Sequence, residues 1–202
     1  MKLYYSPGAC SLAVHIILRE TATPFELVRV DLKGKRTEKG EDYLKVNPKG
    51  YVPALQLDSG ETLTEAGVIL QYLADQRPES GLAPKLGTME RYHLMEILNF
   101  VSTEMHKTLG ALFNPAITSE WRAGVLQRFG MRSDYLATKL DSQQYLAGDK
   151  FSIADAYLFV VLGWTSMHKI DMHPWPALVS YMGRVAARPA VQQAMKAEGL
   201  VK

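Results

Sequence analysis

Cys10 is the single cysteine of the 202-residue chain, and it directly follows the turn sequence Ser6-Pro7-Gly8-Ala9. A helix is expected to begin immediately after it, and the N–H groups and dipole at a helix N-terminus favour an anion. A thiol there should lose its proton more readily than free cysteine, whose pKa is about 8.5. The alternative is a buried cysteine that only packs. Its position between a predicted strand and a predicted helix favours a reactive thiol.

A second feature is the segment 47–53, which reads Asn-Pro-Lys-Gly-Tyr-Val-Pro. A cis bond between Val52 and Pro53 would turn the backbone of Val52 outward, where it could pair with an extended peptide as a sheet edge does. The local sequence alone favours the alternative, an ordinary trans proline that starts an edge strand.

A third feature is the sequence Thr-Glu-Ala-Gly at 64–67, where a strand is expected to end and a helix to begin. Amide donors at such a place suit a carboxylate, and Glu65 could hold an amine. The alternative is that Glu65 only complements the charge of the helix N-terminus.

A fourth feature is a polar stripe of Asn99, Thr103 and His106, whose spacing of four and three residues places them on one helical face. A separate apolar stripe forms the expected core face; it consists of Leu94, Leu98, Val101 and Met105. A helix with both stripes could line a cleft. Without other evidence, a solvated polar face is the favoured interpretation.

Composition limits the partners. The 23 basic and 21 acidic residues give a formal charge of +2, too balanced to indicate a nucleic-acid or membrane-surface partner. The five histidines show no ligand spacing, and without a second cysteine no metal site is expected. No apolar run reaches the roughly 20 residues of a membrane span, and no signal peptide is recognised. An unpaired cysteine fits a reducing compartment, so we expect the cytoplasm.

The strands and helices expected to position these residues form two groups along the chain. Up to residue 77, short strands alternate with helices. Strands are expected at 3–6, 25–30, 53–57 and 61–64, helices at 11–22, 41–46 and 65–76, and a polar loop at 33–40. This order predicts a small α/β domain at 1–77.

The rest of the chain is helical in pattern. Two prolines and two glycines make 78–87 the expected linker. Helices are expected at 88–112, 119–140, 152–169 and 176–187. Ser152 and Asp155 form a start that resembles a capping box. We therefore expect an all-helical domain at 88–202.

These segments together resemble the glutathione transferase superfamily, and its bacterial beta class in particular. Residues 4–11 are similar to the first strand and cysteine turn of that class. Residues 47–55 are similar to the superfamily's cis-proline segment, and 63–66 to its γ-glutamyl-binding turn. Residues 99 and 103–107 resemble the beta-class cleft helix, and 151–155 resemble the superfamily's N-capping box. The match covers essentially the whole chain in the same order.

The resemblance implies the glutathione transferase fold, with an α/β N-terminal thioredoxin-like domain that binds glutathione and an all-α C-terminal domain that carries part of the electrophile site. It also implies a homodimer and a role in detoxification. Val52 would pair with the cysteinyl part of glutathione, Glu65 and Ala66 would hold the γ-glutamyl end, and Lys35 would reach the glycyl carboxylate. Further glutathione contacts are implied for Asn99, Thr103, Glu104 and Met105, partly from the opposite subunit. Cys10 and His106 would face the sulfur as catalytic residues, and Pro53, Ser152 and Asp155 would be structural. Ala66 departs from the serine or threonine common at its position.

The leading hypothesis is an enzyme that directs the glutathione thiolate onto a small hydrophobic electrophile, with no cofactor beyond glutathione itself. Cys10 could also form a mixed disulfide with glutathione, and His106 could act as a base or hydrogen-bond partner. Two alternatives stay open. One is a glutathione-dependent thiol–disulfide reductase, although the chain lacks a second cysteine. The other is a non-catalytic binder of apolar ligands, although the residues that suggest it would also suit a packed core: Trp121, Trp164, Trp175, Met105 and Met167.

Overall fold

The computed structural model describes residues 1–202 as two compact units, one of Met1–Ser80 with Arg188–Lys202 and one of Gly81–Ala187. The sequence prediction placed 88–202 in one helical domain, whereas the last 15 residues of the chain, 188–202, pack with the first unit. No helix combines the length and the apolar character that a membrane span would need.

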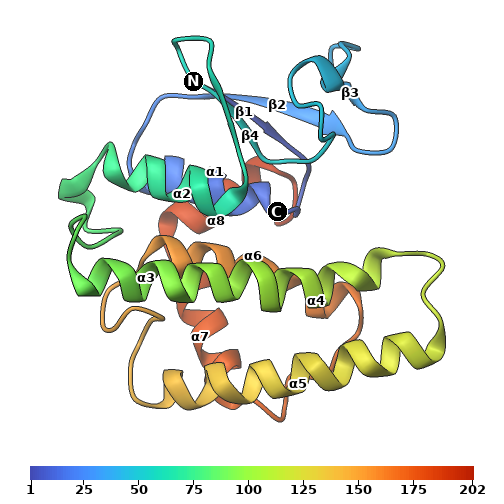
Figure 1. The fold of residues 1–202 in the computed structure, drawn as a ribbon, viewed down its shortest axis with the longest axis vertical. Helices are drawn as coiled ribbons and strands as arrows, with labels where there is room; N and C mark the ends of the chain where they lie inside the picture. Colours follow the sequence, from blue (N-terminus) through green and yellow to red (C-terminus); the bar gives the residue numbers. More distant parts are fainter. The chain divides into compact units, whose positions relative to one another are not determined.

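The first unit is built on a five-stranded sheet with helices on one face (Figure 1). Its strands are β1 (Lys2–Tyr5), β2 (Glu26–Asp31), β3 (Arg36–Thr37), β4 (Ala54–Gln56) and β5 (Thr62–Thr64). They lie in the order β3-β2-β1-β4-β5, with β1 and β2 parallel and every other pair antiparallel. The covering helices are α1 (Ser11–Glu20) and α2 (Ala66–Asp75), and α8 (Pro189–Ala197) packs against α1.

Side-chain alternation in β1 divides the core of this unit into two halves. Leu3 stands opposite Leu27 and Leu55 in the register of the sheet, and it is fully buried. Its neighbour Tyr4 points to the other face, opposite Val28 and Ala54.

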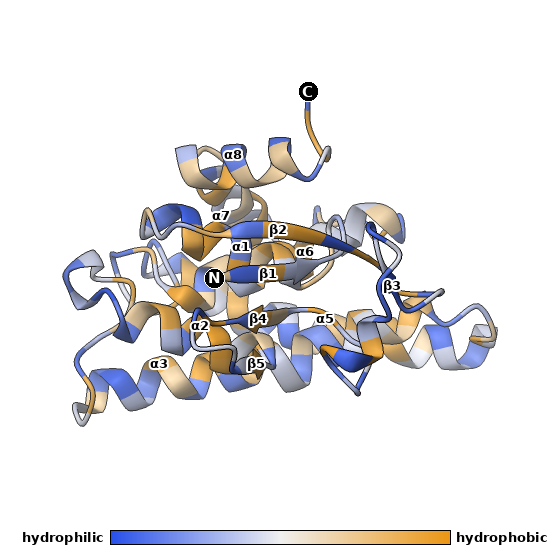
Figure 2. Cartoon of the chain, turned by 90° about the horizontal axis from the view of Figure 1, so that it is seen from above, coloured by the Kyte–Doolittle hydropathy of each residue, from blue (hydrophilic) through white to orange (hydrophobic).

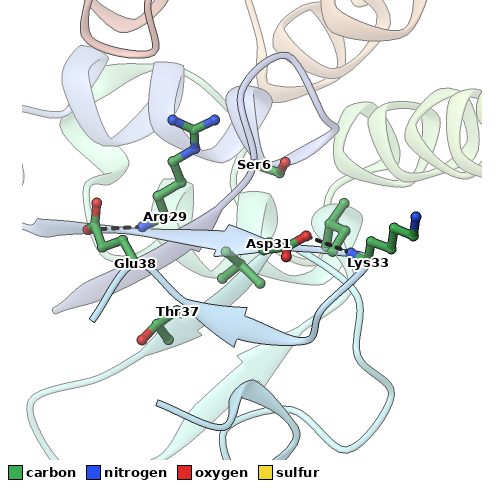
Figure 3. A pocket seen from close by; sticks show the side chains of 8 residues that line it. Ser6, Arg29, Asp31, Lys33, Thr37 and Glu38 are labelled. Carbon is green, nitrogen blue, oxygen red and sulfur yellow. Dashed lines mark hydrogen bonds between the residues drawn. The ribbon is translucent and has the colours of Figure 1, made fainter. Parts of the chain in front are cut away.

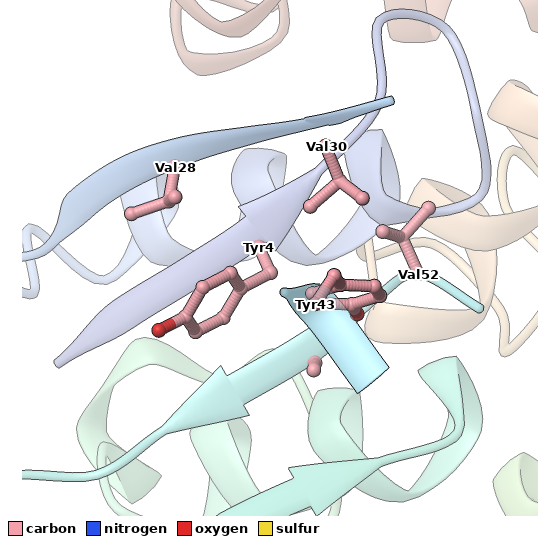
Figure 4. Close-up of a cluster of buried hydrophobic side chains, with 6 residues drawn as sticks. Tyr4, Val28, Val30, Tyr43 and Val52 are labelled. Atoms are coloured by element: carbon pink, nitrogen blue, oxygen red, sulfur yellow. The ribbon is translucent and has the colours of Figure 1, made fainter. Parts of the chain in front are cut away.

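The face that carries Tyr4 is closed by a cluster that we call the Tyr43 cluster (Figure 4). Its members are Tyr4, Val28, Val30, Tyr43, Val52 and Ala54. Tyr43 comes from a 3-10 turn, η1 (Tyr43–Lys45), and it is fully buried. A second short 3-10 turn, η2 (Pro78–Ser80), ends the first part of this unit.

The second unit is entirely helical. Its elements are α3 (Met89–Phe100), a π-helical segment η3 (Val101–His106), α4 (Lys107–Gly110), a 3-10 turn η4 (Ala111–Phe113), α5 (Ser119–Asp141), α6 (Ile153–Met167) and α7 (Pro176–Ala186). Hydrophobic and hydrophilic residues alternate along α3 and α5, as in helices with one solvated face (Figure 2). Every residue of α6 from Ile153 to Leu162 is buried, which makes α6 the central helix of this unit.

The predicted helix at 41–46 is only the 3-10 turn η1, and the structure differs from the predicted elements in three further places. The predicted loop at 33–40 contains β3, because Thr37 pairs with Val30 and is buried. The predicted helix at 88–112 is interrupted by the π-helical segment, whose hydrogen bonds skip one extra residue. Helix α8 was not predicted, although Pro189 stands in its first turn, where proline is favoured.

Candidate active site

The turn that presents Cys10 joins β1 to α1. The N–H of Ala9 donates to the carbonyl of Ser6 at 3.0 Å, and the N–H of Ser6 donates to Ser11 Oγ at 3.2 Å. Cys10 is the N-cap of α1, and its side chain caps no helical N–H. Its Sγ instead donates to the carbonyl oxygen of Val52 at 3.3 Å. The fold therefore brings together two of the predicted site residues that are 42 positions apart.

The backbone before Pro53 is held by hydrogen bonds from two side chains. The Val52–Pro53 peptide bond is cis, as the family resemblance implies and against the preference of the local sequence. The carbonyl of Tyr51 accepts from Tyr43 Oη at 2.6 Å and from Asn47 Nδ2 at 2.7 Å. Burial raises the pKa of Tyr43 to about 12, so its hydroxyl stays a donor near neutral pH. Val52 itself is buried in the Tyr43 cluster.

The start of α2 carries the predicted γ-glutamyl contacts. Glu65 is the N-cap, and its φ of 68° lies in the left-handed region that non-glycine residues seldom occupy. Such strain is typical of functional positions. The Glu65 carboxylate pairs with the Lys49 ammonium, and both side chains are largely exposed. The following residue, Ala66, is buried.

Lys35 is half-buried and also has a positive φ, of 53°. Its Nζ donates to the carbonyl oxygen of Gly50 at 2.9 Å and lies 5.9 Å from the centre of the Tyr51 ring. The ammonium is thus held beside the segment that leads to Val52.

The other predicted site residues belong to the helical unit, in or next to the π-helical segment. Asn99 and Thr103 are exposed, and Thr103 Oγ1 donates to the carbonyl of Asn99 at 3.0 Å. Glu104 Oε2 accepts from Arg132 at 2.7 and 2.9 Å. Met105 is fully buried, as expected for the apolar stripe. A π-helical segment inside a helix is frequently found at a functional site.

His106, the last residue of that segment, is held by aromatic neighbours. Its Nδ1 lies 2.6 Å from Tyr157 Oη, and its ring meets the Trp164 ring edge to face at 4.9 Å. Phe113 continues this row of rings, at 5.4 Å from Trp164 and 4.5 Å from His168. Burial, with Arg122 nearby, holds the pKa of His168 below its ordinary value.

The start of α6 has the predicted capping box. Asp155 Oδ2 accepts from the N–H of Ser152 at 2.8 Å and from its hydroxyl at 2.6 Å. Asp155 Oδ1 accepts from the N–H of Leu146 at 2.8 Å and from Tyr181 Oη at 3.2 Å. The box therefore also fixes the loop before α6 and one side chain of α7.

A cavity of about 560 Å³ lies in the first unit, along the end of β2 (Figure 3). It is lined by Ser6, Arg29, Val30, Asp31, Leu32, Lys33, Thr37 and Glu38. The basic side chains of Arg29 and Lys33 extend in different directions, so they do not converge on one ligand group (Figure 3). None of the predicted site residues lines it.

Sequence reasoning missed two residues of this site, Tyr43 and Asn47. Asn47 belongs to the Asn-Pro-Lys-Gly turn, and an asparagine in a turn commonly bonds to nearby backbone. The sequence therefore contained a signal for the bond that Asn47 makes. For Tyr43 the sequence offers no signal, because its partner is a backbone carbonyl eight residues later.

A sheet with a β1-α1-β2 crossover, a β4-β5 hairpin and a cysteine at the start of its first helix is thioredoxin-like. Such a unit followed by an all-helical unit defines the glutathione transferase fold, and the comparisons with known proteins agree. A family model described as Glutathione S-transferase, N-terminal domain matches residues 8–76, and one described as Glutathione S-transferase, C-terminal domain matches residues 100–189.

Individual proteins match over the full length. Glutathione S-transferase GstA of Escherichia coli O157:H7 is 46% identical over 99% of this chain and 100% of its own. The solved structure of a bacterial beta class glutathione S-transferase from Sphingomonas chungbukensis is 51% identical, with a TM-score of 0.96 over 100% of both chains. A sphingomonad glutathione S-transferase complexed with glutathione is 53% identical, with a TM-score of 0.96 over 100% of both chains.

The chain belongs to the glutathione S-transferase family. The resemblance to the bacterial beta class is confirmed.

Proposed function

We propose that this chain binds glutathione along the segment that ends at Val52 and directs the glutathione thiolate onto small hydrophobic electrophiles. One observation carries the proposal: the sulfur of Cys10 lies 3.3 Å from the carbonyl oxygen of Val52. A peptide that pairs with the Val52 backbone would bring its own cysteine next to Cys10. The complex named among the solved relatives, a transferase with glutathione, supports the same ligand.

The two ends of glutathione would meet opposite charges. Its γ-glutamyl end carries an ammonium and a carboxylate, for which Glu65 and the N–H of Ala66 are suited. Glu65 already holds an ammonium, that of Lys49. An exposed ion pair of this kind is worth only about 0–1 kcal/mol, so a ligand ammonium can replace Lys49 at little cost. Lys35 would pair with the glycyl carboxylate.

In the proposed conjugation the glutathione thiolate attacks a carbon that bears a leaving group. With a chloronitroarene, a C–S bond forms, the C–Cl bond breaks and chloride leaves with its electron pair. Orientation of the two reactants can supply several kcal/mol, within the roughly 7–11 kcal/mol available to well-oriented reactions. Cys10 would donate a hydrogen bond to the attacking sulfur.

A second reaction is open to Cys10 because it is a thiol. Its thiolate can attack the disulfide of oxidised glutathione, which forms a mixed disulfide and releases one glutathione thiolate. We propose this as a side reaction, since the chain has no second cysteine to resolve it. An unpaired cysteine fits a reducing compartment, and we propose the cytoplasm.

The helical unit, within the predicted domain 88–202, would supply part of the electrophile site. The row of rings from His106 through Trp164 to Phe113 suits an apolar, planar group. His106 would act as a base or hydrogen-bond partner. We propose that Asn99, Thr103, Glu104 and Met105 support the glutathione site through their segment, since Met105 is buried and Glu104 is paired with Arg132.

A homodimer is proposed from the surface of the helical unit. Large apolar side chains are exposed on α3 and α5, and a concentration of this kind is typical of an interface. They are Met89, Tyr92 and Met95 on α3 and Met131 and Tyr135 on α5.

The deciding experiment measures conjugation of a chloronitroarene in the unmodified protein and in Cys10→Ser, Cys10→Ala and His106→Ala. Cys10→Ser keeps a donor and should retain conjugation while it loses exchange with oxidised glutathione. His106→Ala should lower kcat/KM by roughly 10²–10⁴, the usual contribution of a positioned acid or base. His93→Ala, an exposed histidine on α3, is the matched control and should change nothing.

Full conjugation in both Cys10→Ala and His106→Ala would remove these residues from the mechanism. Disulfide exchange without conjugation would favour the reductase alternative. Quenching of tryptophan fluorescence by apolar ligands, with no turnover and no glutathione binding by calorimetry, would favour the non-catalytic binder.

A further inference from the structure

The carboxylate of Glu198 is buried in the first unit, next to the turn that presents Cys10. Glu198 Oε2 accepts from the backbone N–H of Gly8 at 3.0 Å, across 190 positions of sequence. Glu198 Oε1 lies 2.9 Å from His15 Nδ1, and the side chains of both residues are fully buried. A buried carboxylate is costly unless its oxygens accept hydrogen bonds, and here both oxygens do.

The hydrogen bonds around His15 assign its protons. Arg19 Nε donates to His15 Nε2 at 3.3 Å, so Nε2 is an acceptor. The proton that Glu198 Oε1 accepts is therefore carried by Nδ1. The guanidinium of Arg19 also lies over the Phe25 ring, 5.2 Å from its centre. The chain of contacts runs from Arg19 through His15 and Glu198 to the Gly8 N–H.

The rest of the C-terminal segment is tied to the same region. Arg188, just before α8, donates to both carboxylate oxygens of Glu20, at 2.7 and 3.0 Å. After Glu198, the side chain of Leu200 lies against Gly8, 3.5 Å from the place where a Cβ would stand. The last residues of the chain thus cover the Cys10 turn.

The hydrogen bond from Gly8 to Glu198 holds a residue whose backbone conformation sets the path of the Cys10 turn. Gly8 has a φ of 71°, which glycine adopts without strain. Because it has no side chain, only contacts of its backbone can fix its conformation. Its N–H is held by Glu198, and Cys10 follows two residues later. A change in the orientation of the Gly8 peptide would move the Cys10 sulfur relative to Val52.

We propose that Glu198 is a positioning residue for Cys10: its carboxylate, oriented by His15, fixes the Gly8 N–H and thereby places the Cys10 sulfur at the Val52 edge. This inference rests on the proposed function, in which Cys10 is a reactive thiol. It assigns to the C-terminus, through Glu198, a part in the active site of the thioredoxin-like unit.

The test uses alkylation of Cys10 by iodoacetamide as a function of pH, because the chain has no other cysteine and the reaction needs no glutathione. Glu198→Gln removes the charge, and Glu198→Asp keeps the charge but withdraws the carboxylate by one methylene. Glu20→Gln is the matched control for the change of charge. Glu20 forms an ion pair with Arg188, which also joins α1 to the C-terminal segment.

The positioning role predicts that the midpoint of alkylation shifts in Glu198→Asp, because the withdrawn carboxylate no longer holds the Gly8 N–H while its charge is kept. Glu198→Gln keeps an amide oxygen for that N–H and therefore reports the effect of the charge alone. Glu20→Gln should keep the midpoint of the unmodified protein even if its melting temperature falls. If Glu198 were only a nearby negative charge, Glu198→Gln would lower the midpoint and Glu198→Asp would leave it unchanged. An unchanged midpoint in Glu198→Asp would overturn the proposal.

Amide exchange of Gly8, followed by NMR, gives a second readout that needs no reactive thiol. The Gly8 N–H should exchange slowly in the unmodified protein and in Glu20→Gln, and at least 10-fold faster in Glu198→Asp, about 1.4 kcal/mol of lost protection. Exchange at the rate of an open loop in the unmodified protein would refute the positioning role. A free-cysteine midpoint in the unmodified protein, with a protected Gly8, would instead refute the proposed reactive thiol.

Discussion

Replacement of Asp155 tests the energetics of the helical unit most directly. In Asp155→Ala the backbone N–H groups of Leu146 and Ser152 lose their acceptor inside the protein. The Tyr181 hydroxyl keeps a second acceptor, the carbonyl of residue 155 at 3.2 Å. The Ser152 hydroxyl also loses the carboxylate as its acceptor, but it can rotate toward another one. Each buried donor left unsatisfied costs about 1–3 kcal/mol, so the two fixed N–H groups predict a loss of about 2–6 kcal/mol in the free energy of unfolding.

The isosteric variant Asp155→Asn should cost less. Its amide oxygen can still accept from Leu146, and its amide nitrogen can donate to the Ser152 hydroxyl. The N–H of Ser152 is then the one fixed backbone donor without an acceptor, which corresponds to about 1–3 kcal/mol, since the hydroxyl can rotate. Asp149→Asn makes the same change of charge at an exposed position six residues earlier and should shift the free energy by less than about 0.5 kcal/mol.

The assay is urea unfolding followed by tryptophan fluorescence. Trp121, Trp164 and Trp175 all belong to the Gly81–Ala187 unit, so the signal reports on the unit that contains Asp155. If Asp155→Ala unfolds at the urea concentration of the unmodified protein, or Asp149→Asn loses as much as Asp155→Asn, the reasoning is refuted.

Three further predictions concern single sites. Because burial raises the pKa of Tyr43 to about 12, the unfolded chain releases this proton first, and stability should fall between about pH 10 and 12; absorbance at alkaline pH should show the buried tyrosines, Tyr43 and Tyr181 among them, ionising only on unfolding. Thr118→Ala removes the oxygen that accepts from the Trp121 N–H at 3.2 Å, and should cost about 1 kcal/mol in urea unfolding, with Ser119→Ala as the control; equal effects would contradict the capping role. Gly124→Ala places a methyl group in open space within α5 and should raise the free energy of unfolding by up to about 1 kcal/mol; a lower urea midpoint would count against it.

Much of the local structure could be read from the sequence because its causes are local. A turn of Pro7 and Gly8 before Cys10 requires the chain to reverse between a strand and a helix. Asp58-Ser59-Gly60 makes a hairpin loop of the same local kind. The capping box of Ser152 and Asp155 is a contact over three positions, so its residues are visible as a short pattern.

The π-helical segment could not be predicted, although the polar and apolar stripes around it were. One extra residue per turn over Val101–His106 leaves the sequence pattern almost unchanged. The strand β3 has only two residues, and its pairing with β2 depends on the rest of the sheet. Such short elements are stabilised by their neighbours more than by their own residues.

The sequence by itself determined which chemistry the chain carries: one cysteine where a helix begins, a proline that precedes a strand, and two halves of different secondary structure. Only the tertiary structure decided what surrounds that cysteine. The carbonyl of Val52 and the carboxylate of Glu198 reach the Cys10 turn from 42 and 190 positions away. No local pattern encodes such contacts, because they exist only once the sheet and α8 have packed around α1 and buried the groups that then need partners.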